Sequence, residues 1–182
     1  MKRCSWCNEN PLYITYHDNE WGIPLHDDQK LFELLMLEGM QAGLSWLTIL
    51  KKRENFRKAF DKFDAKKIAR YDIKKINMLL NDTGIIRNRL KIAAVINNAR
   101  AYLEILEERQ KFNKYIWQFA PDNKKIRSST HQIITRTSES DAMSKDLQKR
   151  GFKFVGTTIC YAFMQASGMV NDHEEECFKY QN

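Results

Sequence analysis

Residues 79–89 read LLNDTGIIRNR and join two predicted helices through a short turn at Gly84. Small apolar residues follow the glycine, and basic residues open the second helix. Backbone N–H groups at such a helix start, with basic side chains beside them, form a site for a phosphate anion. This is a helix-hairpin-helix pattern, which grips a DNA backbone without reading its sequence. An ordinary helical hairpin with clustered surface charge is the alternative. The residues predicted to contact DNA here are Gly84, Ile85, Arg87, Arg89 and Lys91.

Helical patterns extend in both directions from this hairpin. Capping residues and apolar spacing predict helices over residues 27–42, 45–60, 64–71, 72–80, 88–108, 138–150 and 157–168. Ser138 and Asp141 form a predicted capping box, and Gly151 is placed just after the helix that they begin. We also expect one or two turns over 112–119, a loop over 121–137 and a last short helix near Asn171. There is no βαβ alternation and no Gly-rich phosphate loop, so the sequence predicts an all-α fold.

Length and composition set the broad class of the protein. The chain has 182 residues, of which 43% are hydrophobic and 29% charged, as in a globular domain. Only 3 prolines and 7 glycines are present, which argues against a turn-rich β fold. No apolar run approaches the ~18 residues of a membrane span, and no apolar run follows the first charged residues as in a signal peptide. We therefore expect a cytoplasmic protein whose four cysteines are thiols or metal ligands.

Positive charge is concentrated in the middle of the chain. The net charge is +7, and residues 51–100 hold 15 basic and 5 acidic side chains. A localised basic region indicates a polyanionic partner, most often a nucleic acid. A solvated helix surface that keeps the protein in solution is the alternative.

Cysteine and histidine gather at the two ends of the chain. Cys4, Cys7 and His17 lie near the start, and His173 and Cys177 lie four residues apart on a predicted helix near the end. Cys4, His17, His173 and Cys177 would make a closed Cys₂His₂ zinc site, which is structural because no position is open for water. By analogy with a long disulfide loop, joining the ends could contribute as much as ~5 kcal/mol. A Cys4–Cys7 knuckle and a set of unrelated thiols and imidazoles are the alternatives; Cys160 is interpreted as a core thiol.

Glu38 is an acidic residue on the apolar face of its predicted helix, one turn after Leu34. A buried carboxylate is costly unless it is hydrogen-bonded. It could accept N–H groups from the loop before Ser45, or it could bind a flat cationic ring in an aromatic pocket. The second interpretation gains support from aromatic residues in the first 46 positions, although such a cluster is more often plain core. The aromatic residues are Trp6, Tyr13, Tyr16, Trp21 and Trp46.

Four long stretches resemble the constitutive bacterial alkyladenine DNA glycosylases, the DNA-3-methyladenine glycosylase I family. They are NPLYITYHDNEWGIP (10–24), KLFELLMLEGMQAGLSWLTILKKREN (30–55), GIIRNRLKI (84–92) and KRGFKFVGTTICYAFMQASGMVNDH (149–173). The resemblance runs from end to end and is loose only over 104–137. It implies a helix-hairpin-helix DNA glycosylase fold with a structural zinc site joining the N- and C-terminal segments. We expect one unit over 1–182, with a hairpin lobe at about 60–105 and a zinc-tied lobe from about 1–45 and 138–182.

The same resemblance implies roles for individual residues. It selects Cys4, His17, His173 and Cys177 as the Zn²⁺ ligands. It implies that Glu38 hydrogen-bonds the damaged base, that Tyr16 and Trp46 stack on it, and that Tyr13 and Trp21 line the same pocket, with Trp6 in the same aromatic group. Leu44, beside Gly43 in a turn, would enter the duplex where the base has left. The sequence departs from the family's pattern at Glu174 to Glu176, which place three acids beside two of the proposed ligands.

The implied activity is hydrolytic release of N3-methyladenine from alkylated double-stranded DNA. The nucleotide must first be flipped out of the stack. No Gly-Pro-Asp segment follows residue 92, and the pocket helix offers no Schiff-base lysine. We therefore expect a monofunctional glycosylase that leaves an abasic site and yields 3-methyladenine. A monomer is expected for a protein that scans DNA. A non-catalytic zinc-stabilised DNA-binding module is the alternative function, but it does not account for the carboxylate that faces aromatic residues.

Overall fold

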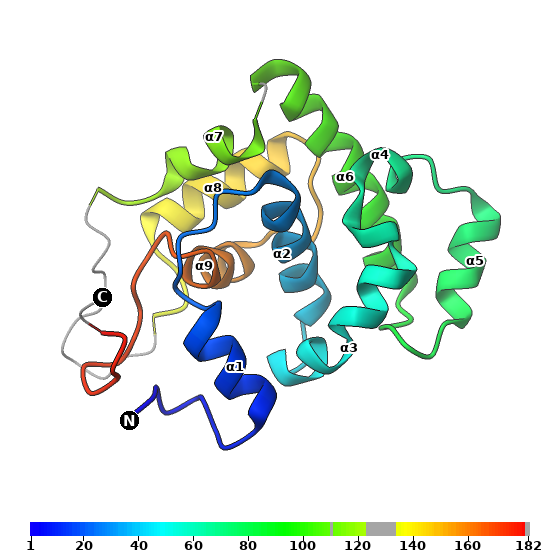
Figure 1. Cartoon of the computed structure of the whole chain (residues 1–182). Helices are drawn as coiled ribbons and strands as arrows, with labels where there is room; N and C mark the ends of the chain where they lie inside the picture. Colours follow the sequence, from blue (N-terminus) through cyan, green and yellow to red (C-terminus); the bar gives the residue numbers. More distant parts are fainter. Residues whose placement is uncertain (110, 123–133, 181–182) are drawn as a thin grey trace.

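The computed structural model describes residues 1–109, 111–122 and 134–180, and the regular elements in these ranges are all helical, as predicted. Figure 1 shows the helices packed around α2 and α9, with α3 to α6 on one side and α7 and α8 on the other. In chain order they are α1 (Pro11–Asn19), α2 (Asp28–Gln41), α3 (Trp46–Ala59), η1 (Asp61–Phe63), α4 (Ala65–Ile68), α5 (Ile73–Asn81), α6 (Arg89–Arg109), α7 (Phe112–Ile116), η2 (Trp117–Phe119), α8 (Ser138–Lys149) and α9 (Thr157–Ala166).

Side-chain caps fix where several helices begin. Asp27, Ser45, Asp64 and Asp72 each accept a backbone N–H from the first turn of the helix that follows. These bonds satisfy amides that have no partner within the helix. The helix starts predicted at these four positions are confirmed.

Helix α1 was not predicted. Asn10 caps it by accepting the N–H of Leu12, and Pro11 occupies its first turn. An Asn-Pro pair is a helix-start signal, because proline needs no hydrogen-bond partner at that position. The amphipathic pattern was missing, since only Tyr16 and His17 of this helix are buried.

Two local predictions are wrong. The capping box of α8 uses Thr137 and Ser140, one residue earlier than the predicted pair. No helix begins near Asn171: residues 171–180 form turns, in which the N–H of Cys177 donates to the carbonyl of Glu174. This segment is polar, and its contacts with the first residues of the chain determine its conformation. Of the predicted loop over 121–137, residues 123–133 lie outside the described residues.

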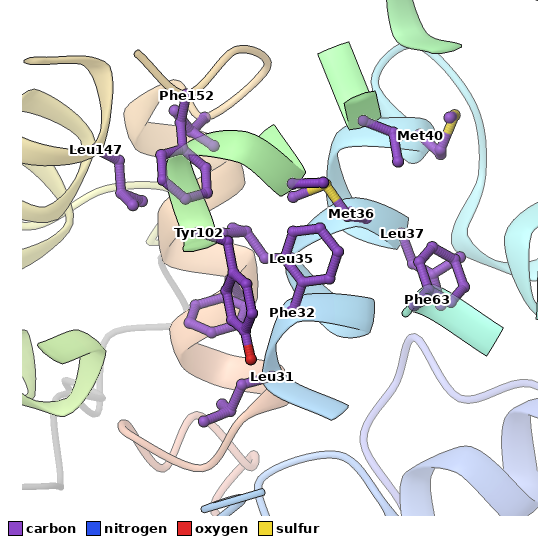
Figure 2. Close-up of a cluster of buried hydrophobic side chains, with 14 of the residues drawn as sticks. Leu31, Phe32, Leu35, Met36, Leu37, Met40, Phe63, Tyr102, Leu147 and Phe152 are labelled. Carbon is purple, nitrogen blue, oxygen red and sulfur yellow. The ribbon is translucent and has the colours of Figure 1, made fainter. Parts of the chain in front are cut away.

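Helix α2 runs through the centre of the core. Leu31, Phe32 and Leu35 are fully buried in it, and Phe32 packs against Tyr102 of α6 (Figure 2), with ring centroids 4.7 Å apart. The helix packs against α3, α6, α7 and α9. Because α2 is enclosed by other helices, its polar residues are held in fixed surroundings.

The C-terminal end of α9 packs directly on the connection between α1 and α2. Gly168 has φ +72°, and a Cβ there would lie 2.5 Å from the carbonyl carbon of Ile23 and the nitrogen of Pro24. Only glycine permits this backbone and this approach. The turns after α9 consequently lie beside the first residues of the chain, and the Phe178 N–H donates to the Lys2 carbonyl at 3.0 Å.

Among the helices of the described ranges, none combines the length and the apolar character that crossing a bilayer requires.

Candidate functional site

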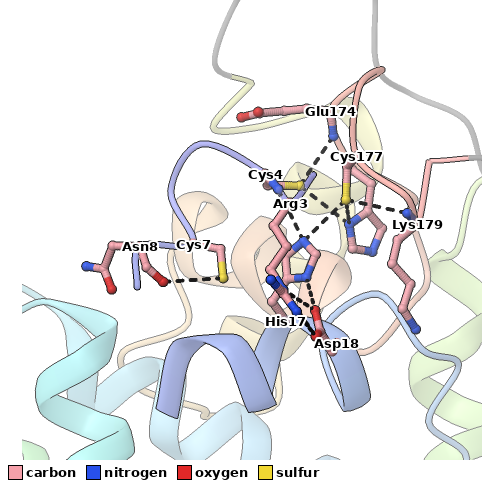
Figure 3. A network of polar contacts seen from close by, with 10 residues as sticks. Arg3, Cys4, Cys7, Asn8, His17, Asp18, Glu174, Cys177 and Lys179 are labelled. Atoms are coloured by element: carbon pink, nitrogen blue, oxygen red, sulfur yellow. Dashed lines mark hydrogen bonds and ion pairs between the residues drawn. The ribbon is translucent and has the colours of Figure 1, made fainter. Parts of the chain in front are cut away.

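Four buried side chains from the two ends of the chain meet in one cluster. Cys4, His17, His173 and Cys177 place their ligand atoms within 4.8 Å of one another. Figure 3 shows Cys4, His17 and Cys177 between α1 and the turns that follow α9. Cys4 Sγ lies 3.5 Å from His173 Nδ1, and Cys177 Sγ lies 3.4 Å from His17 Nε2 and 3.6 Å from His173 Nδ1.

The cluster has the size that a tetrahedral zinc ion needs. Zinc bonds to sulfur and nitrogen of 2.0–2.3 Å correspond to ligand-to-ligand edges of roughly 3.3–3.8 Å. The three distances above fall in this range. All four ligands come from protein side chains, so these residues could hold a metal without leaving a position for a catalytic water.

Neighbouring groups orient the ligands and stabilise negative sulfur. His17 Nδ1 lies 2.8 Å from Asp18 Oδ1, and the Arg3 guanidinium donates to both oxygens of that carboxylate. These contacts, with Arg3 the largest cause, lower the pKa of Asp18 to about 2. The Glu174 N–H donates to Cys4 Sγ at 3.4 Å. A carboxylate behind a ligating histidine fixes its ring orientation.

Cys7 lies outside the cluster, so the knuckle alternative is wrong. Its thiol points towards the Asn8 carbonyl, 3.9 Å away, and away from the ligand atoms (Figure 3). Gly22 is a neighbour that sequence reasoning missed. It has φ +78°, and a Cβ there would lie 2.8 Å from His173 Nε2, so the imidazole has room only because residue 22 is glycine.

The predicted aromatic residues adjoin the metal-ligand cluster. Trp6 packs edge-on against Tyr13 and Trp21, with ring centroids 5.7 and 5.0 Å apart, and Tyr16 lies 5.4 Å from Trp46. Two of these rings touch the ligands: Trp6 lies 5.4 Å from His17, and Trp21 lies 4.6 Å from His173. We call these five rings the aromatic group. The metal ligands and the aromatic group form one packed unit.

Glu38 is buried without a hydrogen bond to any residue that the structure describes. Glu38 is only 3% exposed, and burial raises the pKa of its carboxyl to about 8. The alternative role as acceptor of loop N–H groups is not seen, since the Leu44 N–H donates to Gln41 and the Thr48 N–H to Ser45. Burial and then the charge of Glu38 raise the pKa of Tyr16, which places the two groups in the same region.

A cavity of about 430 Å³ opens between α1, α2 and α3. Its apolar wall includes Tyr16, Trp46 and Leu34, and Glu38 follows Leu34 by one turn on the same side of α2. Trp46 Nε1 is buried with no acceptor among the described residues. Glu38 itself does not line the cavity, although its neighbours on α2, Leu34 and Leu37, do.

Two ion pairs at the edge of this cavity were missed by sequence reasoning. Arg53 donates to both carboxylate oxygens of Glu20, at 2.5 and 2.9 Å, and Arg57 donates to Glu33 at 2.8 Å. No spacing rule links residues on different helices, so only the packing of α1, α2 and α3 reveals them.

The hairpin holds its carbonyl groups inward and its cations outward. Lys52 donates to the carbonyls of Thr83 and Gly84, and Asn55 donates to Gly84. Arg87 and Arg89 are exposed and have no hydrogen bond or ion pair within the described part of the chain. These two arginines are free to meet phosphates.

Two of the predicted DNA-binding residues of the hairpin are buried instead. Ile85 is 3% exposed and packs in the main core, so it can offer only its backbone. Lys91 is 7% exposed, and its ammonium donates to the carbonyls of Met40 and Ala42. Its charge is used inside the protein, so the expectation of a phosphate contact from Lys91 is corrected.

Gly43 and Leu44 form the exposed turn between α2 and α3. Gly43 has φ +77° and Leu44 is 39% exposed. An exposed leucine on a turn with a left-handed glycine is available to contact a partner.

Comparison with known proteins supplies relatives for the whole chain. The family model for methyladenine glycosylase matches residues 6–180. DNA-3-methyladenine glycosylase 1 of Escherichia coli (strain K12) is 54% identical over 182 residues, 99% of this chain and 97% of that protein. A crystal structure of 3-methyladenine DNA glycosylase I has 52% identity and a TM-score of 0.93, over 97% of this chain and 98% of the other. A structure of the Staphylococcus aureus enzyme, solved to explain its 3-methyladenine recognition, has 36% identity and a TM-score of 0.93, over 99% and 97%.

Proposed function

This chain belongs to the methyladenine glycosylase family, and we propose that it excises N3-methyladenine from alkylated double-stranded DNA by hydrolysis. The base leaves as 3-methyladenine and the DNA keeps an abasic site. The proposed reaction includes no strand cleavage.

The buried, unbonded carboxyl of Glu38 beside Tyr16 is the observation on which this proposal depends. An N3-methylated adenine nucleotide has a positively charged ring. A carboxylate held among aromatic rings attracts such a ring more strongly than a neutral adenine, because little water screens the interaction. The charge of the ligand would favour the ionised form of Glu38, which burial disfavours in the free protein.

The reaction itself needs little covalent help from the protein. When the bond between C1′ of the sugar and the base nitrogen breaks, the electron pair stays on the base and cancels its positive charge. Water adds to C1′ and loses a proton. The positive charge that develops on the sugar lies near the DNA phosphates. Glu38 therefore selects and orients the cationic base, while Tyr16 and Trp46 stack on it, and Tyr13, Trp21 and Trp6 enclose the pocket.

The exposed hairpin and turn supply the grip on DNA. Arg87 and Arg89, together with the amides at the start of α6, would neutralise backbone phosphates. Leu44, presented by the turn at Gly43, would fill the gap that the flipped nucleotide leaves.

Zinc is the metal that we assign to Cys4, His17, His173 and Cys177. The tetrahedral spacing, the Cys₂His₂ donor set and the carboxylate behind His17 support it. Its contribution is structural: it joins the two ends of the chain and supports the aromatic group.

Base release from methylated duplex DNA tests the function. Chromatography of the released bases is expected to show 3-methyladenine, with 7-methylguanine left in the DNA. Replacing Glu38→Gln keeps the shape of the side chain and removes its charge, so release should slow by about a hundredfold. Glu107→Gln, at an exposed position on α6 without a hydrogen bond in the described structure, is the matched control and should keep wild-type activity.

The opposite results have clear meanings. DNA binding without base release by the wild type would leave a zinc-stabilised binding module as the function. Full activity of the Glu38→Gln protein would remove Glu38 from the site.

A further inference from the structure

We propose that Lys91 is a positioning residue that couples the hairpin's hold on the DNA backbone to the turn at Gly43 and Leu44; this inference rests on the proposed function. Lys91 lies in the first turn of α6, immediately after the hairpin, and it reaches across to the end of α2. It would act through the turn and would touch neither the base nor the phosphates.

The ammonium of Lys91 satisfies the open end of α2. It donates to the carbonyl of Met40 at 2.8 Å and to that of Ala42 at 2.7 Å. The last carbonyl groups of a helix have no amide partner within it, and a cation at that end also interacts favourably with the helix dipole. With the residue 7% exposed, these contacts are shielded from water, and burial lowers the pKa of Lys91.

The Met40 and Ala42 carbonyls lie, along the chain, between Glu38 and the turn at Gly43 and Leu44. Glu38 precedes Met40 by two residues, and Gly43 directly follows Ala42. A second contact supports the same turn of α2, since a Cβ on Gly39 would lie 3.3 Å from the Phe154 carbonyl. The end of α2 is therefore fixed on two sides, and Lys91 supplies the polar one.

The other end of the connection is the phosphate-binding part of the hairpin. Asn88 accepts the backbone N–H of Lys91 at 3.1 Å and so fixes the first turn of α6. Lys52 and Asn55 hold the hairpin turn against α3 through its carbonyls. A phosphate bound at the start of α6 would therefore be rigidly placed relative to Leu44, because α6 and α2 share the Lys91 ammonium.

The experiment compares Lys91→Met and Lys91→Arg with Arg89→Met and Lys149→Met. Methionine keeps the length of the lysine side chain and removes its donors, and arginine restores a cation. Lys149 is exposed on α8 and has no hydrogen bond in the described structure, so it is the matched control. Four quantities are measured: the single-turnover release rate at saturating protein, the salt dependence of undamaged-duplex binding, the affinity for free 3-methyladenine and the Tm.

The Lys91→Met protein should release base about a hundredfold more slowly from bound duplex, as expected for a small misplacement of an inserted group. Its affinity for free 3-methyladenine and its salt slope should match the wild type, and Lys91→Arg should recover part of the rate. Arg89→Met, in contrast, should lower the salt slope by about one. The free-base affinity also verifies that the Lys91→Met protein is folded.

Three results would overturn the proposal. A salt slope reduced by Lys91→Met with an unchanged release rate would make Lys91 an ordinary phosphate contact. If Lys91→Met changes neither the base-release rate nor the salt slope, Lys91 has no role in the reaction. If Lys91→Met weakens the binding of free 3-methyladenine in parallel with the release rate, its effect is on the pocket. A wild-type protein that releases no base would refute the proposed function, whatever the Lys91 variants do.

Discussion

Glu38 is a buried group whose titration links the stability of the fold to the proposed recognition of a cationic base. In the free protein its carboxyl has no hydrogen-bond partner in the described structure, and burial raises its pKa to about 8. At neutral pH the carboxyl therefore holds its proton, and a cationic base must displace that proton to gain the full charge interaction. The unfolded chain, with water around the same carboxyl, loses the proton near its ordinary pKa of about 4.3.

The free energy of unfolding should therefore fall between about pH 4.3 and pH 8 through this residue. In that window the unfolded state binds fewer protons than the folded state, so rising pH favours unfolding. Glu38→Gln removes the titration, and its stability relative to the wild type should increase steadily from pH 5 to pH 8. Urea unfolding of both proteins at several pH values measures this difference. A difference independent of pH would show that Glu38 is ionised in the folded protein.

Glu38 could be singled out from the sequence, because helical spacing alone places it beside leucines. Lys91 could not, since in the sequence it is one more cation in a basic segment. Its true partners are carbonyl groups of a helix about fifty positions earlier. Only packing distinguishes a lysine that faces a phosphate from one that closes the end of a helix.

Among the elements, the 3₁₀ turn η1 has an unusual backbone. Asp61, Lys62 and Phe63 all have φ between 51° and 58°, a left-handed region that costs roughly 1–2 kcal/mol per residue. Compensating contacts hold it: Phe63 is buried, the Tyr71 hydroxyl donates to Asp61, and Gln29 donates to the Lys62 carbonyl. The turn connects α3 to α4.

Replacing Lys62→Gly should stabilise the protein by up to about 1 kcal/mol, because glycine adopts this backbone without a steric penalty. Lys62 is exposed, and its only contact in the described structure is made by its backbone carbonyl, so little is lost with the side chain. Lys51→Gly, at an exposed position inside α3, is the matched comparison and should destabilise by about 1 kcal/mol. Thermal unfolding of the two variants measures both effects, and equal destabilisation by both would contradict the strain argument.

Helices with a capping residue and an apolar stripe were predictable from sequence. The predictions failed where tertiary contacts outweigh local preference. Residues 171–180 have the spacing of a short helix, but bonds to Cys4 and Lys2 hold them as turns. Helix α1 was missed for a different reason. Its Asn-Pro start signal is present in the sequence, but an apolar stripe is not.

In the whole molecule, the two chain ends meet in the metal-ligand cluster, which packs against the proposed recognition site. His17 and His173 touch Trp6 and Trp21, so the ligands and the aromatic group share one packed surface. The sequence indicated Cys₂His₂ chemistry, but spacing alone left Cys7 as a competing ligand. The division into a hairpin lobe and a zinc-tied lobe stays a prediction.

Removing the metal with a strong chelator should lower the Tm and weaken binding of free 3-methyladenine together. The loss of the join between the ends should cost as much as ~5 kcal/mol, by analogy with a disulfide that closes a long loop. Cys4→Ser should behave like the chelated protein, whereas Cys7→Ser should keep its metal and its affinity. Metal analysis and calorimetry measure these quantities. Unchanged base binding in a metal-free protein would separate the cluster from the pocket.

The order of the ligands along the chain has a consequence for protein synthesis. Cys4 and His17 are made first, and Cys177 follows 160 positions after His17. A chain that ends before His173 carries only two of the four ligands, and its aromatic residues lack the support of the C-terminal turns. Such truncated chains lack the complete metal-ligand cluster, so we expect proteases to digest them faster than the full chain.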